Sequence, residues 1–164
     1  MATPEERLAE LGLAVPEVAK PVAVYVPAVR SGDHVFTSGQ LPMRSGELML
    51  TGKVGAEVSP EEAHACAQQC ALNAIAAVKA EIGDLALVKR VVKVVVFVAS
   101  TPDFAEQHLV ANGASDFIVA ALVAVARPQA VITLPSDSRT VVLAMDVSLS
   151  MRANDVEPSR IVAA

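Results

Sequence analysis

The sequence predicts an α+β fold, with a single sheet of about six strands covered on one face by two long helices. Three observations predict it. Two β-branched runs joined by a turn come first, an apolar face at helical spacing follows, and a second strand and helix precede two final strands. Because the strands are apolar on both faces, self-association is the simplest way to cover the face that the helices leave open.

The composition indicates one globular domain. The chain has 164 residues, of which 53% are hydrophobic and 19% charged, which is enough for a substantial core. Its most apolar stretch, 117–134, is interrupted by Arg127, Pro128 and Gln129 and is too short to cross a bilayer. The N-terminus lacks the pattern of a signal peptide, and two cysteines are too few for a disulfide framework. We therefore expect a cytoplasmic protein without a membrane-spanning segment.

The charge and the aromatic content argue against nucleic acid as the partner. Thirteen basic residues against eighteen acidic ones give a net charge of −5, which disfavours binding to a phosphate backbone. One tyrosine, four phenylalanines and no tryptophan leave little material for stacking on bases.

The first 21 residues predict a short helix and an extended lead-in. Thr3-Pro4-Glu5-Glu6 has the pattern of a capping box with proline at the first helical position, and Gly12 is a natural stop. Pro16 and Pro21 favour an extended chain before the first strand.

A β-hairpin is expected next. The pattern predicts strands at Val22–Val29 and His34–Gly39, with a turn at Arg30–Asp33. Another turn at Pro42–Gly46 leads to a short strand around Leu48–Leu50.

Ser59-Pro60-Glu61-Glu62 predicts the start of a long helix, and Gly83 predicts its end. Between them, apolar residues fall at the three-four spacing of one buried helix face. Cys66 and Cys70 lie on that face, where we interpret them as buried structural thiols. A metal site would need more ligands than these, and the three histidines form no cluster in the sequence.

The second half begins with Val91–Val98, which is so β-branched that we expect a strand covered on both faces. Thr101-Pro102 is expected to cap a second helical region. This region should contain a loop at Ala111–Gly113 and a helix at Ala114–Ala126.

Two final strands are expected at Ala130–Leu134 and Thr140–Ser150. The chain therefore divides into a short N-terminal helix and lead-in (1–21), one domain (22–150) and a loose C-terminal tail (151–164).

Several segments of this domain resemble the RidA/YjgF family, whose older name is the endoribonuclease L-PSP family. The resemblance covers roughly Val22–Ser150 and is greatest to a longer subfamily that carries Asn112-Gly113-Ala114-Ser115-Asp116. The other segments that carry it are Tyr25–Val29, Val35–Pro42, Gly52–Gly55, Cys70–Ala74 and Val91–Val94.

The resemblance implies a chorismate-mutase-like fold and a homotrimer with clefts between subunits. It also implies hydrolysis of reactive enamines and imines to 2-keto acids and ammonia, without a metal or an organic cofactor. An arginine would hold the substrate carboxylate by paired charged hydrogen bonds while a positioned water attacks the imine carbon.

The family pattern assigns five residues to the cleft. Arg127 is the candidate carboxylate clamp, and Tyr25, Ser38, Gly39 and Asn112 are candidates for substrate binding. Four of them have a structural alternative: a core or interface tyrosine, a strand serine bonded to backbone, an Asn-Gly turn or helix cap, and an arginine favoured at the end of an apolar helix by the dipole alone.

Two departures from the family pattern leave the activity open. Pro128 follows Arg127 where the family has a small polar residue, and the distance from Arg127 to Leu134 is one residue shorter than the pattern. Val141 and Leu143 occupy positions where the final strand often carries glutamates. The alternatives are therefore a non-catalytic protein that binds a metabolite or a partner, and, least favoured, a ribonuclease.

Overall fold

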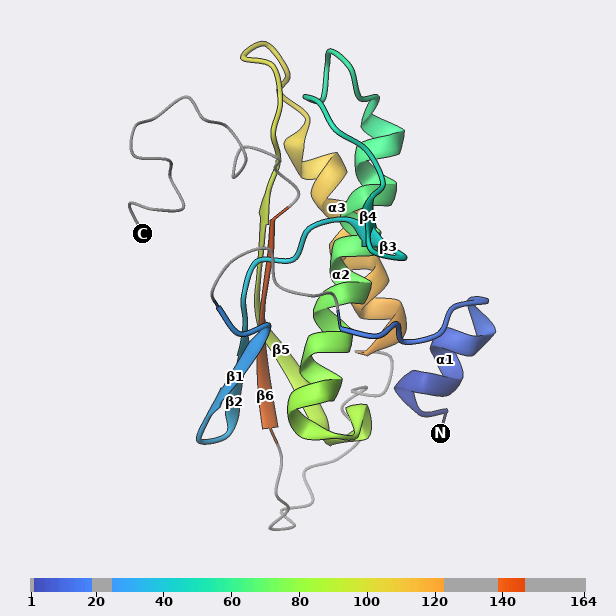
Figure 1. The fold of residues 1–164 in the computed structure, drawn as a ribbon, viewed down its shortest axis with the longest axis vertical. Coiled ribbons are helices and arrows are strands. Elements are labelled where there is room, and N and C mark those ends of the chain that lie inside the picture. The colour runs from blue at the N-terminus through green and yellow to red at the C-terminus, as the bar shows by residue number, and fades with distance from the viewer. Residues whose placement is uncertain (1, 19–24, 123–138, 147–164) are drawn as a thin grey trace, which may run out of the picture.

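The computed structural model describes residues 2–18, 25–122 and 139–146, and for the last range it describes the backbone only. Within these residues the chain forms a four-stranded mixed sheet with its helices on one side (Figure 1). The strand order across the sheet is β1-β2-β6-β5. These strands are β1 (Ala28–Ser31), β2 (His34–Thr37), β5 (Val88–Phe97) and β6 (Arg139–Asp146).

The helices form the second layer. Helix α2 (Pro60–Ile82) lies along the sheet, and α3 (Gln107–Ala121) packs against α2 (Figure 1). The short α1 (Pro4–Glu10) lies on the side of these helices that faces away from the sheet (Figure 1). A 3-10 turn, η1 (Leu85–Leu87), joins α2 to β5.

The central strands of the predicted sheet are confirmed, but several of them begin or end at other residues than predicted. Strand β1 begins at Ala28, later than expected, and only Gly32 and Asp33 form the turn to β2. Strand β6 is parallel to both of its neighbours, β2 and β5. The expected strand at Ala130–Leu134 and the tail after residue 150 lie outside the described residues.

A separate small hairpin accounts for two further strands, β3 (Met43–Arg44) and β4 (Glu47–Leu48). Its turn uses Ser45 and Gly46, both with positive φ (52° and 85°). Positive φ at both central residues matches the right-handed twist of the strands, which favours such two-residue hairpins. The described residues therefore form one sheet of four strands and one of two, instead of a single sheet of about six.

Both predicted capping boxes are confirmed. The Ser59 side chain accepts the Glu62 N–H, and the Glu62 carboxylate accepts the Ser59 N–H at 2.9 Å. Thr3 and Glu6 make the same reciprocal pair at the start of α1. Gly83 ends α2 with φ of 83°, a conformation that glycine adopts without steric cost.

The hydrophobic core lies between the sheet and α2. Cys70, Ala71, Ala74, Ile75 and Val78 of α2 are fully or almost fully buried there, and the core-facing valines of β5 pack against this cluster. Cys66 and Cys70 are buried and are not joined in a disulfide bond, as the helical pattern predicts.

No helix of the described residues covers the opposite face of the sheet (Figure 1). Val29 and Phe36, which pair across the β1–β2 hairpin, are 52% and 43% exposed. On β5, Val92 and Phe97 are also about half exposed. The prediction that β5 is covered on both faces is thus met on one face only.

The prediction for the second helix is wrong at its start. Helix α3 begins at Gln107, after an N-cap residue without a side-chain cap, and runs through the expected loop at Ala111–Gly113. Thr101 does not cap it, because Thr101 lies six residues before Gln107; its N–H donates to the Val54 carbonyl at 2.9 Å. Gly113 instead allows close helix packing: a Cβ there would lie 2.2 Å from the His64 carbonyl oxygen of α2.

Candidate functional site

Three of the predicted site residues, Tyr25, Ser38 and Gly39, lie on neighbouring segments at the end of the first hairpin. Ser38 directly follows β2, and its N–H donates to the Pro27 carbonyl at 2.9 Å. The Ser38 hydroxyl donates to the Val26 carbonyl. Tyr25, 37% exposed, precedes Val26 in the chain, so this bond places Tyr25 and Ser38 on neighbouring segments.

The segment that follows Ser38 is fixed by a buried amide. Gln40 is 6% exposed, and its Nε2 donates to the Ser38 carbonyl at 3.1 Å. Gly39, between them, is exposed to solvent. The Ser38–Gly39 edge is therefore held from inside by Gln40 and presented outward, where a ligand could reach it.

A second buried network fastens the next part of this segment to α2. Asn73, 4% exposed, donates from Nδ2 to the Leu41 and Met43 carbonyls, each at 2.9 Å. Its Oδ1 accepts from Gln69 Nε2 at 3.0 Å, and Gln69 Oε1 accepts from Arg44 Nε at 3.2 Å. The two α2 amides therefore satisfy each other and the hairpin backbone, as buried polar groups must.

The described part of the chain does not bring Asn112 to this edge. Asn112 is exposed on α3, in the helix layer and not in the sheet, and it lies inside the helix instead of at its start or in a turn. Arg127 lies outside the described residues, and its role as a carboxylate clamp stays a prediction.

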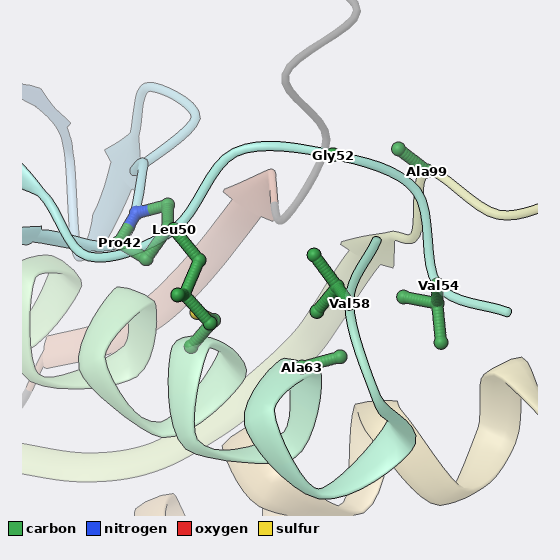
Figure 2. A pocket seen from close by; sticks show the side chains of 8 residues that line it. Pro42, Leu50, Gly52, Val54, Val58, Ala63 and Ala99 are labelled. Atoms are coloured by element: carbon green, nitrogen blue, oxygen red, sulfur yellow. The ribbon is translucent and has the colours of Figure 1, made fainter. Parts of the chain in front are cut away.

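A small apolar pocket opens beside α2 (Figure 2). The chain between β2 and α2 contributes Pro42, Leu50, Val54 and Val58, and the helix contributes Ala63 and Cys66. The space of about 330 Å³ includes open solvent at the mouth, so the enclosed part of the pocket is much smaller.

The electrostatic environment of Cys66 links this pocket to two charged side chains. Burial raises the pKa of the Cys66 thiol, the Glu62 carboxylate raises it further, and the Arg44 guanidinium lowers it. The thiol is 5% exposed, and its raised pKa keeps it protonated and a weak nucleophile at neutral pH.

Two further features of the described residues limit the chemistry. No three His, Cys, Asp or Glu side chains of this part of the chain lie close enough together to hold a metal ion. None of its helices has the length and apolar content needed to cross a membrane.

The sequence reasoning missed the Gln69–Asn73 network and Arg44. One signal was available, because Asn73 interrupts a continuous apolar run of α2, Cys70–Ala77. A polar side chain inside such a run must find a buried partner. The partner is the hairpin backbone, which is distant in sequence and cannot be identified from the helix alone.

The fold and the site define a class of small α+β proteins in which a mixed sheet carries helices on one face and presents a polar edge beside its open face. The family model described as YjgF/chorismate mutase-like, putative endoribonuclease, matches residues 5–143. The chain therefore belongs to this family and has its chorismate-mutase-like fold, with three α-helices among the described residues.

Individual relatives agree with this assignment. Protein TCP17 of Trypanosoma cruzi is 46% identical over 112 residues, which span 68% of this chain and 70% of that protein. The crystal structure of Atu1372 from Agrobacterium tumefaciens, a protein of unknown function, is 40% identical with a TM-score of 0.66, over 88% of this chain and 82% of that one.

A crystal structure of a putative endoribonuclease from Shewanella oneidensis is similar over 88% of both chains, with 29% identity and a TM-score of 0.72. The two solved structures share the fold of this chain. Their names differ in what they say about activity, so the activity of this chain has to be argued from its own residues.

Proposed function

We propose that this protein is a homotrimeric, RidA-like enzyme that hydrolyses small 2-imino acids to 2-keto acids and ammonia in clefts between subunits. The observation that carries the proposal is the bond from the Ser38 hydroxyl to the Val26 carbonyl. It joins the two segments that resemble the family pattern, one with Tyr25 and one with Ser38 and Gly39, into a single exposed edge.

The open face of the sheet supports the proposed assembly. Val29, Phe36, Val92 and Phe97 expose large apolar surfaces on it, and such surfaces in a folded chain mark contact sites. A second copy seated there would also close the space beside Tyr25 and Ser38. Asn112 and Arg127 could then reach the cleft from a neighbouring subunit.

The proposed reaction needs positioning more than reactive groups. Arg127 would hold the substrate carboxylate, while Tyr25, Ser38 and Asn112 orient the imine and a water molecule. The water oxygen forms a bond to the imine carbon, and a water proton moves to the nitrogen. The hydroxyl proton of this adduct then moves to the nitrogen, the carbon–oxygen double bond forms and the carbon–nitrogen bond breaks, which releases ammonia and leaves the 2-keto acid.

The direct test is release of keto acid from freshly generated 2-aminoacrylate and a few longer enamines. Arg127→Ala should lower kcat/KM about a hundredfold, since two charged hydrogen bonds to the carboxylate are lost. Arg30→Ala is the matched control, because Arg30 is exposed and its Nε donates to Gly32 of its own hairpin. Light scattering should give a trimer for all three proteins.

The outcomes separate the parts of the proposal. A fully active Arg127→Ala protein would show that another group holds the carboxylate. No keto acid from any substrate would remove the enzymatic proposal, and a monomer in solution would remove the inter-subunit cleft.

A non-catalytic binding protein is the second candidate. Val141 and Leu143 leave the final strand without the glutamates that could transfer protons, and the Ser38 hydroxyl proton is already donated to the Val26 carbonyl. Saturable binding of 2-ketobutyrate to a trimer that turns over none of the enamines would favour it. RNA cleavage, which the negative charge disfavours, would have to survive rigorous removal of contaminating nuclease.

A further inference from the structure

The protein itself uses every polar group of Ser38. The N–H donates to the Pro27 carbonyl at 2.9 Å, and the hydroxyl donates to the Val26 carbonyl. The carbonyl accepts a hydrogen bond from Gln40 Nε2 at 3.1 Å. The hydroxyl keeps only its lone pairs for a ligand, because its one proton is already donated. Ser38 can therefore accept a hydrogen bond from a ligand but cannot donate one.

The bond from Gln40 sets the direction of the peptide group between Ser38 and Gly39. In a planar trans peptide the C=O and the N–H point in opposite directions. The Ser38 carbonyl faces the buried Gln40 side chain, so the Gly39 N–H points away from it. Gly39 is exposed, and among the described residues its N–H has no hydrogen-bond partner. This edge therefore offers a ligand one donor, the Gly39 N–H, close to one acceptor, the Ser38 hydroxyl.

Glycine makes this direction easy to lose. Because Gly39 has no Cβ, its backbone angles are little restricted, and the peptide group before it can rotate until its N–H faces inward. That rotation would leave the buried Gln40 amide without its acceptor, which is unfavourable. Gln40 therefore selects one of the two directions that a glycine allows.

We propose that Gln40 is a positioning residue of the inter-subunit cleft, which holds the Gly39 N–H toward the cleft as a donor to an oxygen atom of the substrate. This inference rests on the proposed function, because it needs a ligand at the Ser38–Gly39 edge. The Gln40 side chain is buried and acts only through the peptide group. A backbone donor that is fixed before binding loses no freedom when the ligand arrives, which increases affinity.

The first test measures the direction of the Gly39 N–H without any ligand. Gln40→Met keeps a similar side-chain length and removes the donor. Gln107→Met is the matched control, because Gln107 Nε2 also donates to a nearby carbonyl, that of Phe104 at 2.6 Å, in the segment before α3. Residual dipolar couplings from NMR should give the outward direction in wild type and Gln107→Met and a changed coupling in Gln40→Met. An unchanged Gly39 coupling in Gln40→Met would overturn the proposal.

The second test measures binding of 2-ketobutyrate by calorimetry. Gln40→Met should bind at least about tenfold more weakly than wild type, because the ligand oxygen loses a positioned donor. Gln107→Met should stay within about twofold of wild type, since its lost hydrogen bonds lie elsewhere. Equal affinity in the two variants would refute the role of Gln40.

A third variant tests the donor itself by rescue. In Gln40→Glu the ionised carboxylate cannot donate to the Ser38 carbonyl, whereas the protonated carboxyl group can. Its affinity for 2-ketobutyrate, relative to wild type at the same pH, should be low at pH 8 and recover toward about pH 5, because burial favours the protonated form. A ratio that stays constant over this range would contradict the proposal.

Failure of the proposed function gives a different result. A wild-type protein that binds no 2-ketobutyrate and releases no keto acid would refute the enzymatic cleft, and with it the role of Gln40 in binding. The Gly39 couplings would still decide whether Gln40 fixes the peptide group. A wild-type protein that binds, beside a Gln40→Met protein that binds equally well, would refute the positioning role alone.

Discussion

Helices α2 and α3 are neighbours in one layer, but different physical factors determine where each begins. Helix α2 begins at a reciprocal capping box formed by Ser59 and Glu62 and ends at a glycine with positive φ. Helix α3 begins after Glu106, which makes no side-chain cap, and it contains an Asn-Gly pair that normally favours turns. The start of α2 is fixed by its own sequence, and that of α3 by packing.

The contact between Gly113 and His64 shows what packing contributes. Glycine costs a helix about 1 kcal/mol relative to alanine, yet it occupies the middle of α3. Without a Cβ it lets the α3 backbone approach the His64 carbonyl of α2 more closely than any other residue could. An Asn-Gly pair normally favours a turn, but Gly113 lies inside a helix because close packing of α3 against α2 requires glycine at this position.

The largest effect is expected from Gly113→Val. Its Cβ would lie 2.2 Å from a backbone oxygen that cannot rotate away, so the free energy of unfolding should fall by at least about 3 kcal/mol. Ala120→Val adds a β-branched side chain at an exposed position of the same helix and should cost less than about 1 kcal/mol. Urea denaturation measures both, and equal losses would show that α3 does not depend on this contact.

A smaller loss is expected from Asn73→Leu, which leaves α2 helical but breaks its attachment to the hairpin. The Leu41 and Met43 carbonyls lose their donors and Gln69 loses its acceptor, so stability should fall by about 2 kcal/mol. Gln68→Leu, at a half-buried position on the same helix, is the control. A loss no larger than that of the control would mean that water satisfies these groups in the native state.

The same contrast explains which parts of the fold the sequence could predict. The ends of α1 and α2 were predictable because Thr3, Ser59 and Gly83 act on amides and carbonyls within one helical turn. The start of α3 was not, because no side-chain cap marks it, and the segment before it at Thr101 is bonded to Val54, almost fifty residues earlier. Pairing between distant segments leaves no local pattern in the sequence.

The candidate site divides in the same way. The family pattern identifies Tyr25 and Ser38, and the hairpin brings their segments together. Arg44 and Asn73 escaped notice because their roles come from the contact between a hairpin and a helix. The exposed apolar residues of the sheet were predictable from the apolar strands, whereas the surface that covers them stays a prediction.

The two helix starts can be compared directly by exchanging their caps. Ser59→Ala should cost about 1 kcal/mol, since the Glu62 N–H loses its acceptor. Glu106→Ser should change stability by less than about 0.5 kcal/mol, because capping serines need an extended backbone, and Glu106 has φ of −106° and ψ of 31°. A gain of about 1 kcal/mol from Glu106→Ser would show that the start of α3 also adjusts to a local cap.

The smallest expected effect is a pH dependence of the stability that the capping box contributes at the start of α2. Hydrogen bonds from the Ser59 N–H and hydroxyl lower the pKa of Glu62 below its ordinary value of 4.5. The ionised carboxylate therefore contributes stability that is complete above the ordinary pKa and is lost as the pH falls through the lower pKa of the folded state. The stability difference between wild type and Glu62→Gln should accordingly shrink between neutral pH and about pH 3.

A double-mutant comparison assigns this pH dependence to the cap. In a Ser59→Ala background the hydroxyl no longer donates to Glu62, so the same Glu62→Gln substitution should show a weaker dependence on pH. If the dependence is equally strong in both backgrounds, the hydroxyl does not contribute to it, and the backbone amide alone lowers the pKa of Glu62. If wild type and Glu62→Gln differ by the same amount at every pH, the capping box does not depend on charge, and the start of α2 is held by hydrogen-bond geometry alone.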